Sequence, residues 1–157
     1  MGLIGKVFGA ITGIPTASDK ALLDTLCLAA AVDGDASRLE LGYALEIALD
    51  LPGFQKVSKK RLEKMLEEAL EGVRACADTS ASIQKVATRI ESPEEREQAY
   101  TLAAVMEYVD GKVSDDETRF LSSFRAALGI SQERGRQILA EVERELKDAQ
   151  RSNLMNG

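Results

Sequence analysis

Hydrophobic positions recur with helical spacing along nearly the whole chain. Ala, Leu, Glu, Lys and Arg dominate, and no stretch alternates apolar with polar residues over the length of a strand. The sequence therefore predicts an all-α protein. The expected helices lie near residues 19–33, 38–50, 59–76, 80–90, 93–109, 115–128 and 132–151.

Two of these expected helices are apolar on nearly every side. They contain the runs Ala21–Val32 and Ala99–Val109, whereas the helix expected from residue 132 carries a single apolar stripe. A helix that is apolar all round has to be covered by other helices. We therefore expect a compact bundle of about seven helices, with these two at its centre and amphipathic helices around them.

Residues typical of helix ends occur near the expected boundaries. Three Ser-x-x-Glu capping boxes predict helix starts, at Ser37 with Glu40, Ser92 with Glu95 and Ser114 with Glu117. Four glycines are interpreted as stop signals, namely Gly34, Gly53, Gly111 and Gly129.

A nine-residue pattern, V-D-G-x-x-S-x-x-E, occurs twice, beginning at Val32 and at Val109. Each copy follows a central apolar helix and precedes an amphipathic one. After a four-residue insertion in the first copy, Ser58 aligns with Ser131. The sequence thus predicts two pseudo-symmetric halves, joined by a connector with a short helix near residues 77–92.

Composition excludes several functions. The chain has 157 residues, enough for one domain with an adequate core, and it has no His. Ser-His and Cys-His nucleophile pairs and common zinc sites are therefore absent. The net charge of -6 gives no reason to expect nucleic-acid binding. Cys27 and Cys76 lie in apolar runs without CxxC spacing, which favours buried thiols in a reducing cytoplasm.

The negative charge is concentrated in the two halves of the repeat. Residues 21–50 hold six acidic residues and one basic residue, and residues 94–117 hold eight acidic and two basic residues. These stretches carry -5 and -6, so the rest of the chain carries +5. A protein partner is therefore expected at an acidic face.

The doubled motif resembles the TerB family of tellurite-resistance proteins, over about residues 20–148. The resemblance implies a seven-helix bundle with pseudo-two-fold halves. It also implies a non-enzymatic cytoplasmic interaction module for tellurite or stress resistance, with other tellurite-resistance components as partners. Motif acids of the family gather into a divalent-metal site, which maps here to Asp33, Glu40, Asp110 and Glu117. Lys112 stands where the first copy has Asp35, so the symmetry of the pattern is incomplete.

The same acids have simpler interpretations that stay open. Asp-Gly is an ordinary turn pair, and Ser-x-x-Glu is an ordinary helix start. If a metal binds, oxygen ligands without imidazole favour Ca²⁺, Mg²⁺ or Mn²⁺. An EF-hand is excluded because its first and third loop positions would be Met106 and Tyr108 in one copy and Ala29 and Ala31 in the other.

Two further functions remain as alternatives. Paired carboxylates with a hard metal are the equipment of a metal-dependent hydrolase. The apolar residues 1–14 favour either a short helix docked on the domain or a membrane-peripheral anchor. We expect residues 1–18 to form an N-terminal apolar segment, 19–151 the helical domain and 152–157 a disordered tail.

Overall fold

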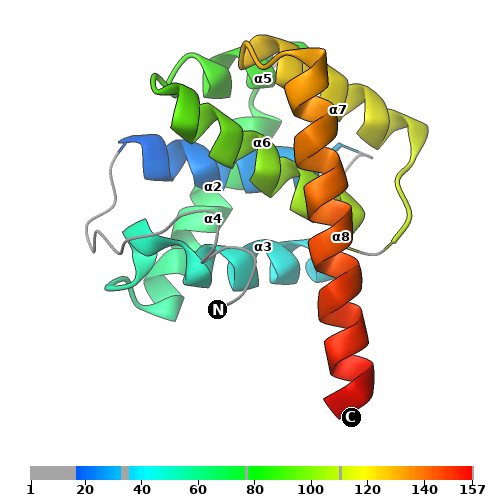
Figure 1. Cartoon of the computed structure of the whole chain (residues 1–157). Coiled ribbons are helices and arrows are strands. Elements are labelled where there is room, and N and C mark those ends of the chain that lie inside the picture. Colours follow the sequence, from blue (N-terminus) through cyan, green and yellow to red (C-terminus); the bar gives the residue numbers. More distant parts are fainter. Residues whose placement is uncertain (1–16, 33–35, 77, 110, 157) are drawn as a thin grey trace.

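The computed structural model describes residues 17–32, 36–76, 78–109 and 111–156. Within them the chain forms seven α-helices and one short 3-10 helix, and no strand (Figure 1). The elements are α2 (Ala17–Ala30), α3 (Arg38–Asp50), η1 (Pro52–Phe54), α4 (Lys59–Arg74), α5 (Thr79–Ala87), α6 (Pro93–Tyr108), α7 (Asp115–Ala127) and α8 (Gln132–Asn156). The predicted all-α bundle of about seven helices is confirmed.

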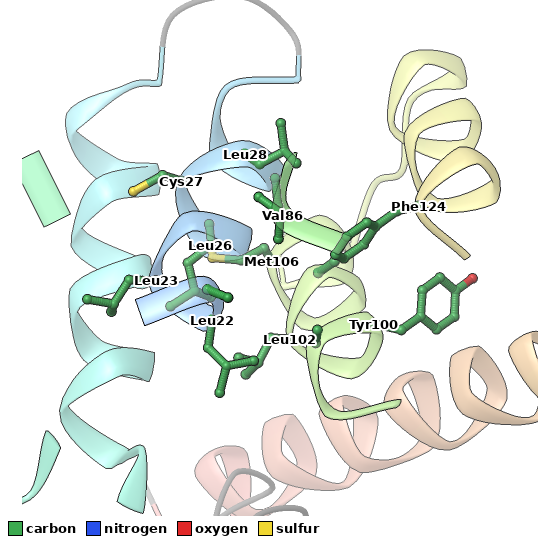
Figure 2. Close-up of a cluster of buried hydrophobic side chains, with 14 of the residues drawn as sticks. Leu22, Leu23, Leu26, Cys27, Leu28, Val86, Tyr100, Leu102, Met106 and Phe124 are labelled. Atoms are coloured by element: carbon green, nitrogen blue, oxygen red, sulfur yellow. The ribbon is translucent and has the colours of Figure 1, made fainter. Parts of the chain in front are cut away.

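Helices α2 and α6 occupy the centre, as their apolar sequences predict. Helix α2 contacts α3, α4, α5 and α6, while α6 also contacts α7 and α8. Every residue of α6 from Ala99 to Glu107 is buried. Figure 2 shows side chains of both helices, including Leu26 and Leu102, meeting in one cluster with Val86 of α5 and Phe124 of α7.

The surrounding helices bury one face each. Helix α4 turns Leu62, Leu66 and Leu70 inward, at the four-residue spacing of a single stripe. Helix α7 buries Phe120 and Phe124, whose rings stack with centroids 5.6 Å apart and planes inclined by 13°. Such an aromatic pair adds roughly 0.5–1.5 kcal/mol beyond the area it buries. The charged faces of these helices are left to solvent.

The repeat is preserved in the boundaries of the second helix of each half. Helices α3 and α7 both have 13 residues, and they begin at residues 38 and 115 and end at residues 50 and 127, a constant offset of 77. The third helix of each half begins after a serine, Ser58 before α4 and Ser131 before α8. Helix η1 lies in the insertion of the first half. The two halves are therefore α2–α3–α4 and α6–α7–α8, with α5 between them.

The structure confirms two of the four glycines that were predicted to end helices. Gly111 and Gly129 have left-handed φ angles of 78° and 72°, which suit glycine and end α6 and α7 as predicted. Gly53 does not end a helix. Helix α3 already ends at Asp50, because Pro52 keeps Leu51 extended (φ -71°, ψ 136°), and Gly53 lies buried inside η1. Gly34 is outside the described residues.

Helix α8 differs from its predicted length. It continues to Asn156, across residues expected to form a disordered tail, because no Gly or Pro interrupts residues 136–156. Its C-terminal end extends past the other helices at the bottom of the view in Figure 1. At the other end of the chain, most of the expected 1–18 segment lies outside the described residues. Among the helices that are described, none has the length and apolar character needed to span a bilayer.

Candidate functional site: the two acidic turns

The structure describes two of the four predicted metal ligands. Glu40 and Glu117 are the third residues of α3 and α7, and both are partly buried. Asp33 and Asp110 lie outside the described residues. The predicted four-carboxylate site therefore stays a prediction, and its described part is a matched pair of glutamates at helix starts.

A complete capping box holds each glutamate. The hydroxyl oxygens of Ser37 and Ser114 accept the backbone N–H of Glu40 and Glu117, both at 3.1 Å. In return, the serine N–H groups donate to a carboxylate oxygen of the same glutamates, both at 3.4 Å. The Ser-x-x-Glu spacing shared by the two motifs thus gives matching cap geometry, and the predicted boxes at Ser37 and Ser114 are confirmed.

The donor chemistry of these glutamates fits a hard cation. The return contact at 3.4 Å is longer than a normal N–H···O bond and uses one of the two oxygens of each carboxylate. An ionised carboxylate offers about four acceptor positions, so capping does not exhaust it. Among the described residues, no three Asp, Glu or Cys side chains lie close enough together to hold a metal ion.

The end of α2 and the start of α7 line one hollow. Its volume is about 360 Å³, and its lining includes Val32, Asp116 and Arg119 together with the start of α5. Val32 immediately precedes Asp33, and Asp116 immediately precedes Glu117. Val32, which follows α2, and Asp116, in the first turn of α7, therefore line the same hollow.

Local electrostatics also support a structural role for the acids. Helix α7 begins with Asp115, Asp116 and Glu117, and negative charge in the first turn of a helix is favourable by roughly 0.3–1 kcal/mol. Asp116 also forms an ion pair of 3.6 Å with Arg119, exposed at both ends. Capping and dipole effects account for these acids at the helix starts.

One acidic residue near the second turn was missed by sequence reasoning. Glu107 is only 4% exposed although it belongs to the central helix α6. Burying a carboxylate is costly unless its environment compensates the charge. The equivalent residue of the first half, 77 positions earlier, is Ala30. In the sequence, Glu107 could have been noticed as the single acidic residue inside the apolar run Ala99–Val109. We add Glu107 to the candidate residues of the site.

The fold and the two motifs define a two-repeat helical domain in which each half has an Asp-Gly pair in its sequence, followed by a capped helix. The family model described as Tellurite resistance protein TerB matches residues 19–140. The chain belongs to this family and is a tellurite-resistance-family module. Searches of curated proteins and of solved structures found no match.

Proposed function

We propose that the chain is a non-enzymatic cytoplasmic interaction module of tellurite or stress resistance, and that it binds a divalent metal at its two acidic turns. Asp33, Glu40, Asp110 and Glu117 are the proposed ligands. The observation that supports this proposal is that Val32 of the first motif and Asp116 of the second line the same hollow. Membership of the TerB family supports the tellurite-resistance setting.

The proposed role of the metal is to hold acidic groups of the two halves together. Carboxylates brought close repel one another, and a bound cation removes that repulsion. Oxygen ligands from carboxylates suit Ca²⁺, Mg²⁺ or Mn²⁺. Metal binding would thereby set the spacing of α3 and α7 and the charge of the face that meets a partner.

The proposed partner is a protein with a basic surface, another component of the tellurite-resistance system. The acidic stretches 21–50 and 94–117 favour such a partner by charge complementarity. The structure offers no specific observation in favour of a hydrolase, and turnover of phosphate esters with Mg²⁺ or Mn²⁺ would contradict the non-enzymatic part of the proposal.

The test separates metal binding from helix capping. Gln can replace Glu in a capping box, so the double variant Glu40→Gln/Glu117→Gln keeps both caps and loses two charges. The matched variant Ser37→Ala/Ser114→Ala loses the caps and keeps the carboxylates. Calorimetric titration with CaCl₂, MgCl₂ and MnCl₂ should show binding to the wild type and to the serine variant, and weaker binding by about tenfold or more to the glutamine variant.

Two results would contradict the metal hypothesis. One is the absence of binding heat at millimolar concentrations of all three cations. The other is equal affinity of the wild type and the glutamine variant, which would leave Glu40 and Glu117 with a capping role only. The variant Asp33→Asn/Asp110→Asn tests the other two proposed ligands in the same titration, because Asn can form the turn without a charge.

A further inference from the structure

A second cavity lies in the other half of the molecule, between α6, α7 and α8. Its volume is about 230 Å³. Tyr100 and Tyr108 line it from α6, Arg125 from α7, and Gly135 and Arg136 from α8. The cavity is below the roughly 300–1,000 Å³ typical of sites for drug-sized ligands. It therefore has room for a small molecule only.

Two basic side chains belong to the lining of this cavity. Arg125 and Arg136 are its only charged side chains among the described residues. Its other polar side chains are four hydroxyls and one amide, all able to donate a hydrogen bond: Tyr100, Tyr108, Thr118, Ser122 and Gln132. A protein with a net charge of -6 thus carries a hollow in which two arginines and several donors are set in a mainly apolar lining. The two arginines favour a small anion.

Tyr100 brings its hydroxyl to the wall of the cavity. The residue is 2% exposed, and no hydrogen bond joins its hydroxyl to any described residue. An accessible tyrosine hydroxyl without a protein partner can donate a hydrogen bond to a ligand. Figure 2 shows the hydroxyl at the edge of the hydrophobic cluster, pointing away from Leu22 and Leu26. It lies 3.7 Å from the position that a Cβ at Gly135 would occupy. The hydroxyl is therefore positioned to donate to a ligand in the cavity.

Arg125 is held in place beside this hydroxyl. Its Nη1 donates to the carbonyl oxygen of Ile130, and a Cβ at Gly135 would lie 2.6 Å from its Cδ. Glycine at position 135 thus makes room for the side chain of Arg125 across α8. Burial raises the pKa of Tyr100, and the positive charge of Arg125 opposes that rise. One bond to Ile130 leaves further guanidinium N–H groups for a ligand.

We propose that the cavity binds a small oxyanion, with Arg125 and Arg136 as its counter-charges and the Tyr100 hydroxyl as a donor. Arginine is suited to this role because its planar fork matches the oxygens of carboxylates and phosphates. Burial raises the pKa of Tyr108 and the nearby carboxylate of Glu143 raises it further, so negative charge acts at that end of the cavity. The anion consequently sits toward Arg125. This site is independent of the proposed metal at the acidic turns.

The oxyanion has two chemical sources, and the test distinguishes them. Sodium phosphate and sodium sulfate represent inorganic oxyanions, and sodium benzoate represents a small organic carboxylate. Each is compared with sodium chloride at equal ionic strength, by thermal unfolding and by calorimetric titration. A ligand that binds only the folded state raises its stability in proportion to the logarithm of ligand concentration above Kd. We expect at least one probe to raise Tm above the chloride control.

Two variants with matched controls assign the site. Tyr100→Phe removes the hydroxyl and keeps the ring in the core, and Tyr43→Phe makes the same change on α3. Arg136→Gln removes a charge from the cavity wall, and Arg144→Gln makes the same change further along α8. We expect Tyr100→Phe and Arg136→Gln to weaken binding of the active probe about tenfold each, and the two controls to bind like the wild type.

Each outcome decides for or against the proposal. Tm measured in chloride shows that each variant is folded before its binding is judged. The absence of a shift with all three probes at millimolar concentration would overturn the proposal. Binding that survives both Tyr100→Phe and Arg136→Gln would also overturn it, because the anion would then occupy another place. A response to benzoate alone would assign the site to organic carboxylates, and a response to phosphate or sulfate alone would assign it to inorganic oxyanions.

Discussion

Gly53 is a position where the addition of one methyl group should lower the stability of the fold. It is buried in η1, and a Cβ built there would overlap the Asp19 side chain on α2, with the two carboxylate oxygens 2.5 and 2.6 Å away. Real Cβ atoms essentially never come this close to other atoms. Gly53→Ala therefore requires α2 and η1 to separate or the Asp19 carboxylate to move.

The expected magnitude follows from two opposing effects. Alanine restricts the unfolded chain and on that account stabilises by about 0.4–1 kcal/mol. Overpacking of a close contact costs about 1–3 kcal/mol. The net expectation for Gly53→Ala is a loss of about 1–2 kcal/mol. The matched control is Gly42→Ala, inside α3, where nothing lies within 4 Å of the new Cβ. It should stabilise by about 1 kcal/mol, the usual penalty of glycine inside a helix.

Urea unfolding followed by circular dichroism measures both variants against the wild type, with unchanged slopes as the sign of two-state behaviour. For a domain of this size, Tm should rise by about 2–4 °C in Gly42→Ala and fall by about 2–8 °C in Gly53→Ala. In an Asp19→Ala background the cost of Gly53→Ala should disappear, because Asp19→Ala deletes the three atoms that the new Cβ would overlap. Equal stabilisation by the two glycine replacements would refute the reasoning.

Three further predictions concern caps, a thiol and an ion pair. Ser37→Ala and Ser114→Ala should each lower the free energy of unfolding in urea by about 1 kcal/mol, because the two caps have matching geometry. The two losses should add in the double variant, since each cap acts on its own helix. Unequal losses would contradict the equivalence of the halves. Burial raises the pKa of Cys27 from 9.0 to about 12, so its contribution to stability is complete below about pH 9 and is lost as the pH rises toward 12. In urea titrations at a series of pH values, the free energy of unfolding should therefore decline less steeply above pH 9 for Cys27→Ala than for the wild type. Parallel declines of the two proteins would count against this explanation. Arg134 donates to one oxygen of Glu97 from Nε at 3.0 Å and from Nη2 at 2.8 Å, but the side chains are 44% and 39% exposed. A double-mutant cycle should find a coupling of about 0.2–1 kcal/mol that decreases with salt, and a salt-independent value would show that the pair is better shielded than its exposure indicates.

The bundle could be predicted from the sequence because its determinants are local. Runs such as Ala99–Val109 identify buried helices by composition alone, and the boxes at Ser37 and Ser114 identify helix starts within one turn. The constant spacing of the motifs predicted matching halves, and α3 and α7 match at both ends. The prediction for Gly53 was wrong because a neighbouring residue ends the helix and because Gly53 packs against another helix. Gly53 was interpreted as a stop signal, whereas Pro52 acts on Leu51 and Gly53 faces Asp19.

The candidate sites could be predicted only in part. The doubled motif singled out Glu40 and Glu117, but sequence alone could not place Val32 beside Asp116, because their helices meet only in the folded bundle. Glu107 was hidden in an apolar run. The oxyanion cavity had no sequence signal, since Tyr100, Arg125 and Gly135 belong to three helices and share no motif. Their chemistry arises from tertiary packing.

The central position of α2 has a consequence for synthesis of the protein. Its last residue is Ala30, and α6, one of the helices that cover it, ends at Tyr108, which is 78 residues later (108 minus 30). At about 5–20 residues per second, translation leaves an interval of roughly 4–16 s in which that side of α2 has no cover from α6. The most apolar helix of the first half is thus made before the helix that shelters it. During that interval Leu22, Leu26 and their neighbours are the surface on which a chaperone, or aggregation, would act.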